Sequence, residues 1–412
     1  SPVITITIYP GLEHTCILPG PTSVLFMTTE SVIDVLIIGG GPAGSSLAWA
    51  LRGSGLVVAI MDKQTFPRQK VCAGWITPAV IEELQIDLDD YAKDRVLQPI
   101  TGFRISQLGQ KQVQSKYPDE PVSYGIRRIE FDDYLLQRCG AELLLGQAFK
   151  SMEVTSEGWL VNDSIRARLV VGAGGHFCPV ARAIGSKGVS ETAVAAQEAE
   201  FRMTDAQREA CSIDEEVPEL FFTPDLLGYG WVFRKGDYLN IGLGREDKKR
   251  LSSHVQDFCD YLVAQGKIPE GITEKYNGHA YLLYNHAERN LVKDNVLLIG
   301  DSAGLAYPQS GEGIRPAVES ALLAAHTIKA CKGNYSADCL QAYSSELEKR
   351  FGKRLPEPGL MERLPVGIKQ LFASQLMKTH WFTKNVVTDK WFLHSHQPAL
   401  TEEVPTRHQD RS

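Results

Sequence analysis

Apolar and polar positions alternate in blocks along the first part of the chain. Residues 35–38 form a continuous apolar run that predicts a buried strand, and residues 57–61 form a second one that ends at Asp62. The stretch between them, 45–52, is typical of a helix. This order of strand, helix and strand predicts a βαβ unit with parallel strands.

The same block pattern recurs some 250 residues later. Residues 296–299 predict a strand that ends in Gly300-Asp301, a loop rich in Pro and Gly covers 308–313, and a helix begins near Ile314. Between the two regions, helices are predicted at 78–85 and 130–139 and a strand at 169–171. These segments would lie beside the βαβ unit.

The middle of the chain follows a period of two. Residues 95–120 alternate weakly and predict antiparallel strands of a second sheet. In "GYGWVFRKGDYLNIGLG", 228–244, Tyr229, Trp231 and Phe233 fall on one face of a strand, and "RKGD" suits the turn of a β-hairpin. Such rings pack a core or line a ligand cavity, and the hairpin alone leaves both interpretations open.

Near the C-terminus the spacing changes to steps of four. The pairs Phe372 and Leu376, Met377 and Trp381, Phe382 and Val386, and Val387 and Trp391 predict an amphipathic helix with Lys369, Lys378, Lys384 and Lys390 nearby. Two interpretations fit: a helix that covers the substrate domain, or a peripheral contact with a membrane surface. Residues 396–412 are expected to be a flexible tail.

Composition narrows the class of protein. A net charge of -7 over 412 residues argues against nucleic acid as the main partner. No apolar run is long enough for a transmembrane helix. The eight cysteines show no zinc-ligand spacing and are expected to be reduced thiols of a cytoplasmic protein, so no metal site is predicted. Residues 1–26 lack Lys and Arg and are expected to be a non-core extension preceding a start at Met27.

The loop after the first strand carries a nucleotide-binding fingerprint. "GGGPAG" supplies G-x-G-x-x-G: Gly39 permits the tight turn, Gly41 lets the backbone approach a pyrophosphate, and Gly44 lets helix and strand pack closely. The helix N-terminus then faces the phosphates with free N–H groups. Asp62 lies 23 positions after Gly39 and can accept hydrogen bonds from ribose hydroxyls. At this point both FAD and NAD fit.

The second block favours FAD. Asp301, at a strand end, can accept a hydrogen bond from a ribityl hydroxyl, and Gly311 and Gly313 allow backbone N–H groups to reach the flavin. The dipole of the helix that follows would stabilise negative charge on a reduced flavin. We therefore expect an FAD site assembled from distant segments, with FAD held non-covalently.

Four motifs resemble those of the geranylgeranyl reductase family, within the FAD-dependent oxidoreductases related to para-hydroxybenzoate hydroxylase. They are "FPRQKVCAG" (66–74), "RRIEFDDYLL" (127–136), "GDSAGLAYPQSGEGI" (300–314) and the hairpin, which is similar to Y-x-W-x-F-P followed by G-x-G. The resemblance covers about residues 32–345. In two places the chain departs from the family pattern: Arg234 stands where the family has Pro, and Gly174 where it has Asp.

The resemblance implies a role for each matching residue. Cys72 is expected beside the flavin, with a part in catalysis. The residues expected to hold FAD are Gly39, Gly41, Pro42, Ala43, Gly44, Asp62, Lys63, Lys70, Cys72, Ala73, Arg128, Gly174, Asp301, Gly311, Gly313 and Ile314. The residues expected to contact substrate are Tyr229, Trp231, Phe233, Gly242 and Gly244. His176, His279 and His286 are expected to be ordinary loop or hydrogen-bonded residues.

The predicted fold class is α/β (α+β overall), with a Rossmann-like FAD-binding domain built from discontinuous segments and a second, antiparallel β-sheet domain for substrate. The expected divisions are 32–94, 121–189 and 290–333 for FAD, 95–120 and 190–289 for substrate, and 334–395 for a C-terminal helical region.

The predicted activity is reduction of C=C bonds in an isoprenoid or other lipid-like substrate by hydride transfer from reduced flavin. The alternatives are an FAD-dependent monooxygenase or halogenase and, with less support, an electron-transfer flavoprotein. The expected partners are an apolar substrate and an electron donor. No second dinucleotide fingerprint is present, which leaves transient NADPH and a ferredoxin-like protein open as donors.

Overall fold

The apolar strands recognised in the sequence pair in parallel and build the first sheet. The computed structural model describes residues 32–186, 191, 193–247, 249–272, 275–286, 289–354 and 373–401. Within these residues, β1 (Ile33–Ile38) lies between β11 (Ile165–Gly172) and β2 (Val58–Asp62). The sheet continues with β8 (Glu142–Leu145) on one side and with β18 (Val296–Leu298) and β17 (Val292–Lys293) on the other, while β10 (Gly158–Val161) and β9 (Met152–Thr155) extend from β11.

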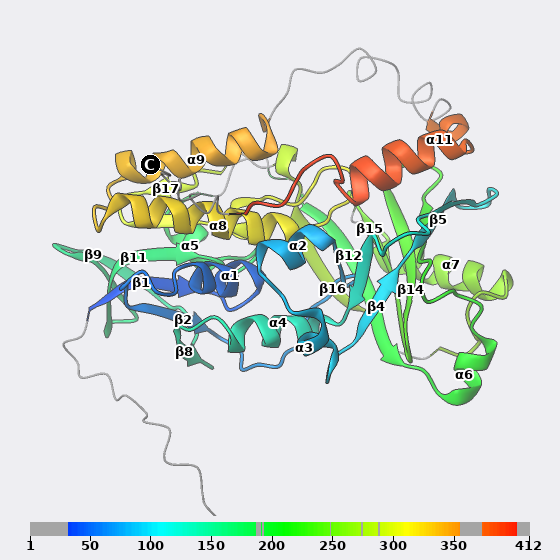
Figure 1. Cartoon of the computed structure of the whole chain (residues 1–412), viewed down its shortest axis with the longest axis horizontal. Helices are drawn as coiled ribbons and strands as arrows, with labels where there is room; N and C mark the ends of the chain where they lie inside the picture. The colour runs from blue at the N-terminus through cyan, green and yellow to red at the C-terminus, as the bar shows by residue number, and fades with distance from the viewer. Residues whose placement is uncertain are drawn as a thin grey trace, which may run out of the picture. The chain divides into compact units, whose positions relative to one another are not determined.

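Helices cover this sheet and define its core. Helix α1 (Pro42–Ala50) begins three residues before the predicted start, because Pro42 supplies the fixed φ that suits the first position of a helix. It packs against α8 (Ile314–Cys331), and α8 lies beside α9 (Ala337–Phe351) (Figure 1). Helix α4 (Arg128–Gln137) packs against α1, and the short α5 (Pro179–Ala183) packs against β11.

The second sheet is long-stranded and carries the hairpin. Its order is β16-β12-β15-β14-β13-β5-β6, and its pairings are antiparallel except for β13 with β5. The bounds are β5 (Gly102–Gln107), β6 (Val113–Lys116), β12 (Ala193–Arg202), β13 (Glu219–Phe222), β14 (Gly228–Lys235), β15 (Tyr238–Arg245) and β16 (Asn277–Leu282). Helix α7 (Leu251–Ala264) packs on β12 and β15, and the short α6 (Asp205–Ala210) follows β12 (Figure 1).

A small third sheet takes a strand that the sequence placed elsewhere. β4 (Leu97–Ile100) pairs with β7 (Ser123–Ile126), and β7 pairs with β3 (Trp75–Ile76). Of the strands predicted in 95–120, β5 and β6 therefore join the second sheet but β4 does not. A weak alternation indicates a strand without specifying its partner. The helices α2 (Pro78–Glu83) and α3 (Leu88–Ala92) follow β3.

The C-terminal helical segment differs in its winding from the prediction. The short α11 (His380–Phe382) leads into a π-helix over Thr383–Phe392. The Leu393 N–H donates to the Thr388 carbonyl at 2.9 Å, five residues back. The wider turn buries Thr383, Val387, Thr388 and Phe392. A pattern in steps of four indicates a helix but does not distinguish these two windings.

Some predictions fall outside the described residues. These are the extension 1–26, Lys369 and Phe372 of the predicted helix, and residues 402–412 of the predicted tail. The division of the chain into an FAD-binding and a substrate-binding domain stays a prediction. No helix among the described residues is long and apolar enough to cross a membrane.

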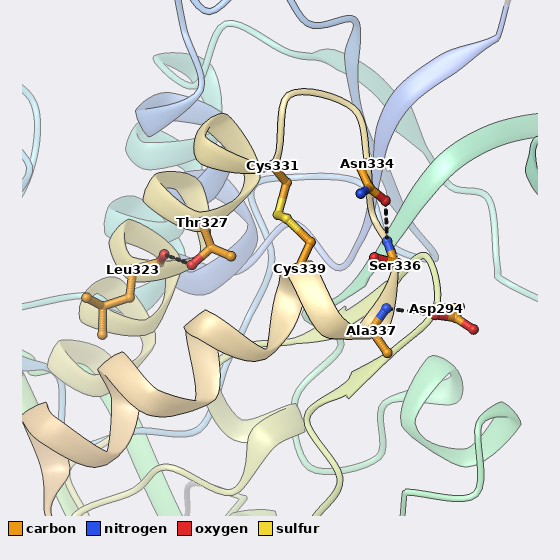
Figure 2. Close-up of a disulfide and its surroundings, with 8 residues drawn as sticks. All are labelled: Asp294, Leu323, Thr327, Cys331, Asn334, Ser336, Ala337 and Cys339. Carbon is orange, nitrogen blue, oxygen red and sulfur yellow. Dashed lines mark hydrogen bonds between the residues drawn. A yellow bond between two sulfur atoms is a disulfide. The ribbon is translucent and has the colours of Figure 1, made fainter.

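One disulfide corrects the expectation that the cysteines are reduced. Cys331, the last residue of α8, is bonded to Cys339 in the first turn of α9 (Figure 2). The two Cα atoms lie 6.0 Å apart. Nearby, the Ala337 N–H at the start of α9 donates to Asp294 Oδ1 at 2.7 Å, which satisfies a helix N-terminal donor. The spacing of the cysteines did not indicate this pair. The two residues meet because the end of α8 and the start of α9 lie together in the fold.

We predict that replacing both bonded cysteines, Cys331→Ser with Cys339→Ser, lowers the free energy of unfolding by about 2 kcal/mol, since a cross-link over a short loop restricts the unfolded chain modestly. Denaturant-induced unfolding of the FAD-loaded protein measures this. Dithiothreitol should lower the midpoint of the unmodified protein and leave the double variant unaffected. Equal midpoints for both proteins without reductant would contradict the prediction.

Candidate active site

A cavity of ≈ 600 Å³ gathers residues from segments far apart in the sequence. Its volume lies within the range typical of ligand sites. Most of the predicted site residues line it: Gly39, Gly41, Pro42, Ala43, Asp62, Lys63, Lys70, Cys72, Ala73, Arg128, Gly174, Tyr229, Trp231, Phe233, Asp301, Gly311, Gly313 and Ile314. Gly44, Gly242 and Gly244 do not line the cavity, and their contacts show that they act by supporting its walls.

The turn between β1 and α1 forms one end of the cavity. Gly39 has φ +118°, and a Cβ there would lie 2.4 Å from the Ala173 carbonyl oxygen. A Cβ on Gly44 would lie 1.9 Å from the Gly39 carbonyl oxygen. Both glycines are therefore required by close backbone packing, as the fingerprint predicts.

Asp62 is the last residue of β2 and lies at the same end of the cavity. Its Oδ2 accepts from the Gly40 N–H at 2.8 Å, and its Oδ1 accepts from the Gln64 N–H at 2.9 Å. These bonds fix the carboxylate at the carboxyl end of the strand, beside the α1 N-terminus. An acceptor held there suits a ribose hydroxyl, while the helix N-terminus suits phosphate.

The segment after β11 packs directly on this turn. The Ala173 N–H donates to the Ile38 carbonyl at 2.8 Å, and Gly174 lies on the cavity wall where the family has Asp. His176, two residues further along the same wall, has a buried Nδ1 without a hydrogen-bond partner. Burial, and secondly the charge of Arg289, lower the pKa of His176 to about 4, so the imidazole is neutral near pH 7. The sequence placed His176 in an ordinary loop, and the structure places it in a turn on the cavity wall.

A cluster of Lys70, His279 and Asp301 lies on another wall. Lys70 Nζ is 2.9 Å from His279 Nε2, and His279 Nε2 is 3.9 Å from Asp301 Oδ2. Burial lowers the pKa of Lys70 to about 8, with Asp301 opposing the shift. Burial alone would raise the pKa of Asp301, but His279, Lys70 and Arg128 lower it below its ordinary value. The Asp301 carboxylate therefore stays ionised and can accept hydrogen bonds.

The loop before α8 matches its prediction in part. Gly313 caps α8 and lines the cavity, so the helix N-terminus points at the site. The Gly311 N–H, however, donates to the Tyr307 carbonyl at 2.8 Å, so in this structure it is not a free donor for a flavin. A Cβ on Gly311 would lie 2.5 Å from the Tyr281 hydroxyl, which explains the glycine by packing. The Tyr229 hydroxyl donates to the Ser310 carbonyl and ties the hairpin to this loop.

Cys72 lies where the polar and apolar walls meet. Its N–H donates to the buried Glu198 carboxyl group, and its Sγ accepts from the Gly74 N–H at 3.4 Å. The Arg128 guanidinium is the nearby cation that interacts electrostatically with the thiol. Burial alone would lower the pKa of Arg128, but Asp132 and the thiol raise it above its ordinary value. Lys70, two residues before Cys72, contacts His279.

Arg128 is held rigidly for this role. Its Nε and Nη2 donate to the two carboxylate oxygens of Asp132 at 2.7 and 2.8 Å, and Arg68 lies 3.2 Å from the same carboxylate. Asp132 is completely buried. A bidentate pair fixes the plane of the guanidinium. The "RRIEFDDYLL" motif therefore places a fixed cation on the cavity wall.

The three rings of the hairpin answer the question that their spacing left open. Tyr229, Trp231 and Phe233 all line the cavity. Trp231 and Phe233 are at the same time buried in a cluster with Trp75 and Phe392. The Trp75 ring centroid is 5.4 Å from that of Phe233 and 5.5 Å from that of Phe392. The rings thus form a wall that is packed on one side and faces the cavity on the other.

The glycines of G-x-G support this wall. A Cβ on Gly242 would lie 2.2 Å from the Trp231 ring, so the indole can lie against β15 only because that side chain is missing. Gly244 approaches Tyr281 and Ala196 more loosely. Arg234 continues β14, and its guanidinium lies 2.8 Å from Glu215. The turn is therefore Gly236-Asp237, shorter than the predicted "RKGD".

The cavity lining also includes residues that were not predicted, among them Trp75, Tyr281, His279 and Phe392. His279 and Tyr281 alternate on β16 and face the cavity together, a period-two signal too short to detect from the sequence. Trp75 follows the Cys72 loop directly. Phe392 comes from the end of the π-helix, and no local pattern links that segment to the site.

The nucleotide end of the cavity fits FAD. The turn without side chains at Gly39 and Gly41 admits a pyrophosphate, and Asp62 and Asp301 offer fixed acceptors at two places. The residues expected to hold FAD therefore form a consistent donor and acceptor set.

Comparisons with known proteins agree with this fit. The family model for the FAD binding domain matches residues 32–94 and 151–355. Digeranylgeranylglycerophospholipid reductase 3 of Methanosphaera stadtmanae is 29% identical over 345 residues, which span 78% of this chain and 84% of that protein. Menaquinone reductase of Mycobacterium tuberculosis is 29% identical over 349 residues, 79% of this chain and 82% of that protein.

A solved structure shares the fold along most of the chain. It is a geranylgeranyl bacteriochlorophyll reductase-like protein from Thermoplasma acidophilum, with a TM-score of 0.67 and 21% identity, covering 90% of this chain and 94% of that one. The resemblance recognised in the motifs, the expected fold class and FAD as the cofactor are thereby confirmed. The chain belongs to the FAD binding domain family and is an FAD-dependent oxidoreductase related to the geranylgeranyl reductases.

Proposed function

We propose that this oxidoreductase reduces carbon–carbon double bonds in the isoprenoid chain of a lipid-like substrate. The observation that carries the proposal is the two-sided character of the cavity. Its nucleotide end is built of glycines and fixed carboxylates, whereas the opposite end is walled by apolar and aromatic side chains: Trp75, Leu220, Trp231, Phe233 and Phe392. An apolar chain that enters this end comes to lie beside the cofactor's place.

The residues of this chain have separate tasks in such a reaction. Bound FAD, once reduced, supplies the hydride. Gly39, Gly41 and Asp62 hold the nucleotide, and the aromatic wall excludes water and aligns the double bond. Protonation of the second carbon requires an acid, and Lys70, with a pKa of about 8 and His279 beside it, can hold a proton at Nζ near pH 7.

Other chemistries use related folds, so the product of the reaction decides between them. A monooxygenase or halogenase would give an oxygenated or halogenated product, and a pure electron carrier would give no lipid product. The apolar end of the cavity favours an enzyme with its own organic substrate over an electron carrier. The motifs around Cys72 and the hairpin favour the reductase.

The C-terminal segment supports a contact with the membrane surface where such a lipid is found. Trp381 is 67% and Leu376 39% exposed, and Lys378 and Lys390 are exposed on the same segment. Aromatic, apolar and basic side chains together suit the lipid–water interface. The π-helix of this segment ends at Phe392, which lines the apolar end of the cavity. A membrane contact there would therefore lie next to that end.

We predict that Trp381→Ala weakens binding to vesicles containing anionic lipid severalfold without changing FAD content, because an exposed indole is lost at the interface. Flotation of the FAD-loaded protein with such vesicles measures the bound fraction. Phe177→Ala, which removes another exposed ring (66% exposed) outside this segment, serves as the control and should leave binding unchanged. Equal flotation of Trp381→Ala and the unmodified protein would rule out this contact.

We predict that Cys72→Ser retains FAD but lowers turnover of lipid more than its binding, because the thiol lies on the cavity wall near the Arg128 guanidinium. Steady-state reduction of a polyprenyl lipid gives kcat and KM. Cys259→Ser is the matched control, since Cys259 lies on α7 outside the cavity lining. Unchanged kcat in Cys72→Ser would remove the thiol from the catalytic residues.

We predict that Trp231→Ala binds FAD and accepts electrons from dithionite, yet passes them to a polyprenyl lipid on the order of a hundredfold more slowly, since misalignment by about 1 Å has an effect of this size. Anaerobic reoxidation of the reduced flavin by the lipid measures the rate, and mass spectrometry of the lipid identifies the product. Trp231→Phe, which keeps a ring, should lose less. Reoxidation at the unmodified rate in Trp231→Ala would remove the main support for the proposed function.

A further inference from the structure

Asn240 links two walls of the cavity without lining it. It lies on β15 and is completely buried. Its Oδ1 accepts from the Trp231 indole Nε1–H at 2.8 Å. Its Nδ2 donates to the Cys72 carbonyl and to Glu200 Oε2, both at 3.1 Å. One side-chain amide thus holds the indole of the aromatic wall and the backbone of the Cys72 loop together.

The orientation of this amide follows from its partners. Glu200 Oε2 lies 2.8 Å from Lys235 Nζ, and Arg127 contacts the other oxygen at 3.3 Å, so the carboxylate is held in place as an acceptor. Lys235 is in turn fixed by the Ile126 carbonyl at 2.8 Å. Turning the amide over would set Oδ1 against a carboxylate and a carbonyl, and would set the NH₂ group against the indole N–H. The network therefore permits one orientation.

The backbone of Cys72 is hydrogen-bonded through both its N–H and its carbonyl. Its N–H donates to Glu198 and its carbonyl accepts from Asn240. Trp231 is held equally firmly, because its ring lies against Gly242 and its one polar atom bonds to Asn240. Asn240 bonds to both the Cys72 backbone and the Trp231 ring. Removing its side chain would therefore break several hydrogen bonds of one buried network at once.

We propose that Asn240 is a positioning residue that fixes the position of the Trp231 ring relative to the Cys72 thiol across the cavity. The effect of Asn240 on catalysis rests on the proposed function, whereas its effect on the positions of Trp231 and Cys72 does not. The direct effect of Asn240 is on Cys72 and Trp231, and through these two residues it affects the alignment of a substrate.

The first experiment measures the Cys72 loop without any substrate. In the FAD-loaded protein, iodoacetamide alkylation of Cys72 is followed by peptide mass spectrometry, with Cys259 on α7 as the internal reference. Asn240→Leu removes all three hydrogen bonds at nearly constant volume and should raise the alkylation rate of Cys72 about tenfold relative to Cys259. Asn277→Ala, which changes an exposed position on β16 of the same sheet, should leave the ratio unchanged.

The second experiment tests whether Asn240 transmits the effect of Trp231. Trp231→Phe removes the indole N–H but keeps a ring, and should itself raise Cys72 alkylation severalfold. In the Asn240→Leu background the same change should add nothing, because the link is already broken. Additive effects would overturn the proposal, as would an unchanged Cys72 ratio in Asn240→Leu. If Asn240→Leu does not yield folded, FAD-loaded protein, Asn240→Ser takes its place in the same cycle.

Lipid reduction separates this proposal from the proposed function. Asn240→Leu should lower kcat at least tenfold with little change in KM, since the substrate still enters the cavity but is misaligned. Failure of the unmodified protein to reduce any polyprenyl lipid would refute the proposed function and leave the alkylation result standing. Normal lipid reduction by Asn240→Leu with unchanged alkylation would refute the role of Asn240 alone.

Discussion

The structure depends on the crossing of β1 and α1, where backbone meets backbone with no side chain between. A methyl group on Gly44 would lie 1.9 Å from the Gly39 carbonyl, and one on Gly39 would lie 2.4 Å from the Ala173 carbonyl. Three backbone segments therefore approach one another more closely than a side chain at Gly39 or Gly44 would allow. This closeness opens the helix N-terminus to the cavity and brings Asp62 and Gly174 to the same end.

Paired charges then divide the cavity into two environments. Arg128 is locked by Asp132, and Lys70 and His279 stand beside Asp301, so the ionised groups of this wall have partners. A buried charge without a partner would be costly, whereas these pairs keep polarity at the nucleotide end. The opposite end has aromatic side chains that interlock at ring distances of about 5 Å. Cys72 lies at the border, and a reacting bond would have to lie there as well.

The aromatic wall is closed by the far end of the chain. Arg315 at the start of α8 donates to the His394 carbonyl at 3.3 Å and to the Gln397 carbonyl at 2.7 Å, and its Nε bonds Glu319 at 2.8 Å. These bonds hold the C-terminal segment against the helix whose N-terminus faces the cavity. Phe392 is thereby brought to the Trp75 ring. Arg315 directly follows the motif of residues 300–314. It therefore links α8 to the C-terminal segment that carries Phe392.

The sequence by itself determined the βαβ unit, the FAD fingerprint, the second cofactor segment and the hairpin with its rings, because each follows from spacing within some 30 residues. It could not determine that the Arg128 guanidinium lies near Cys72 while Lys70 contacts His279, that the Gly311 N–H is used internally, or that Cys331 bonds Cys339. The sequence likewise could not show that His279, Phe392 and Asn240 lie at or beside the cavity, since this depends on where β15, β16 and the π-helix lie in the fold. Hydrogen bonding and apolar packing act between atoms a few ångströms apart, and the distance in space between residues such as Cys72 and Asn240 is decided by tertiary folding alone.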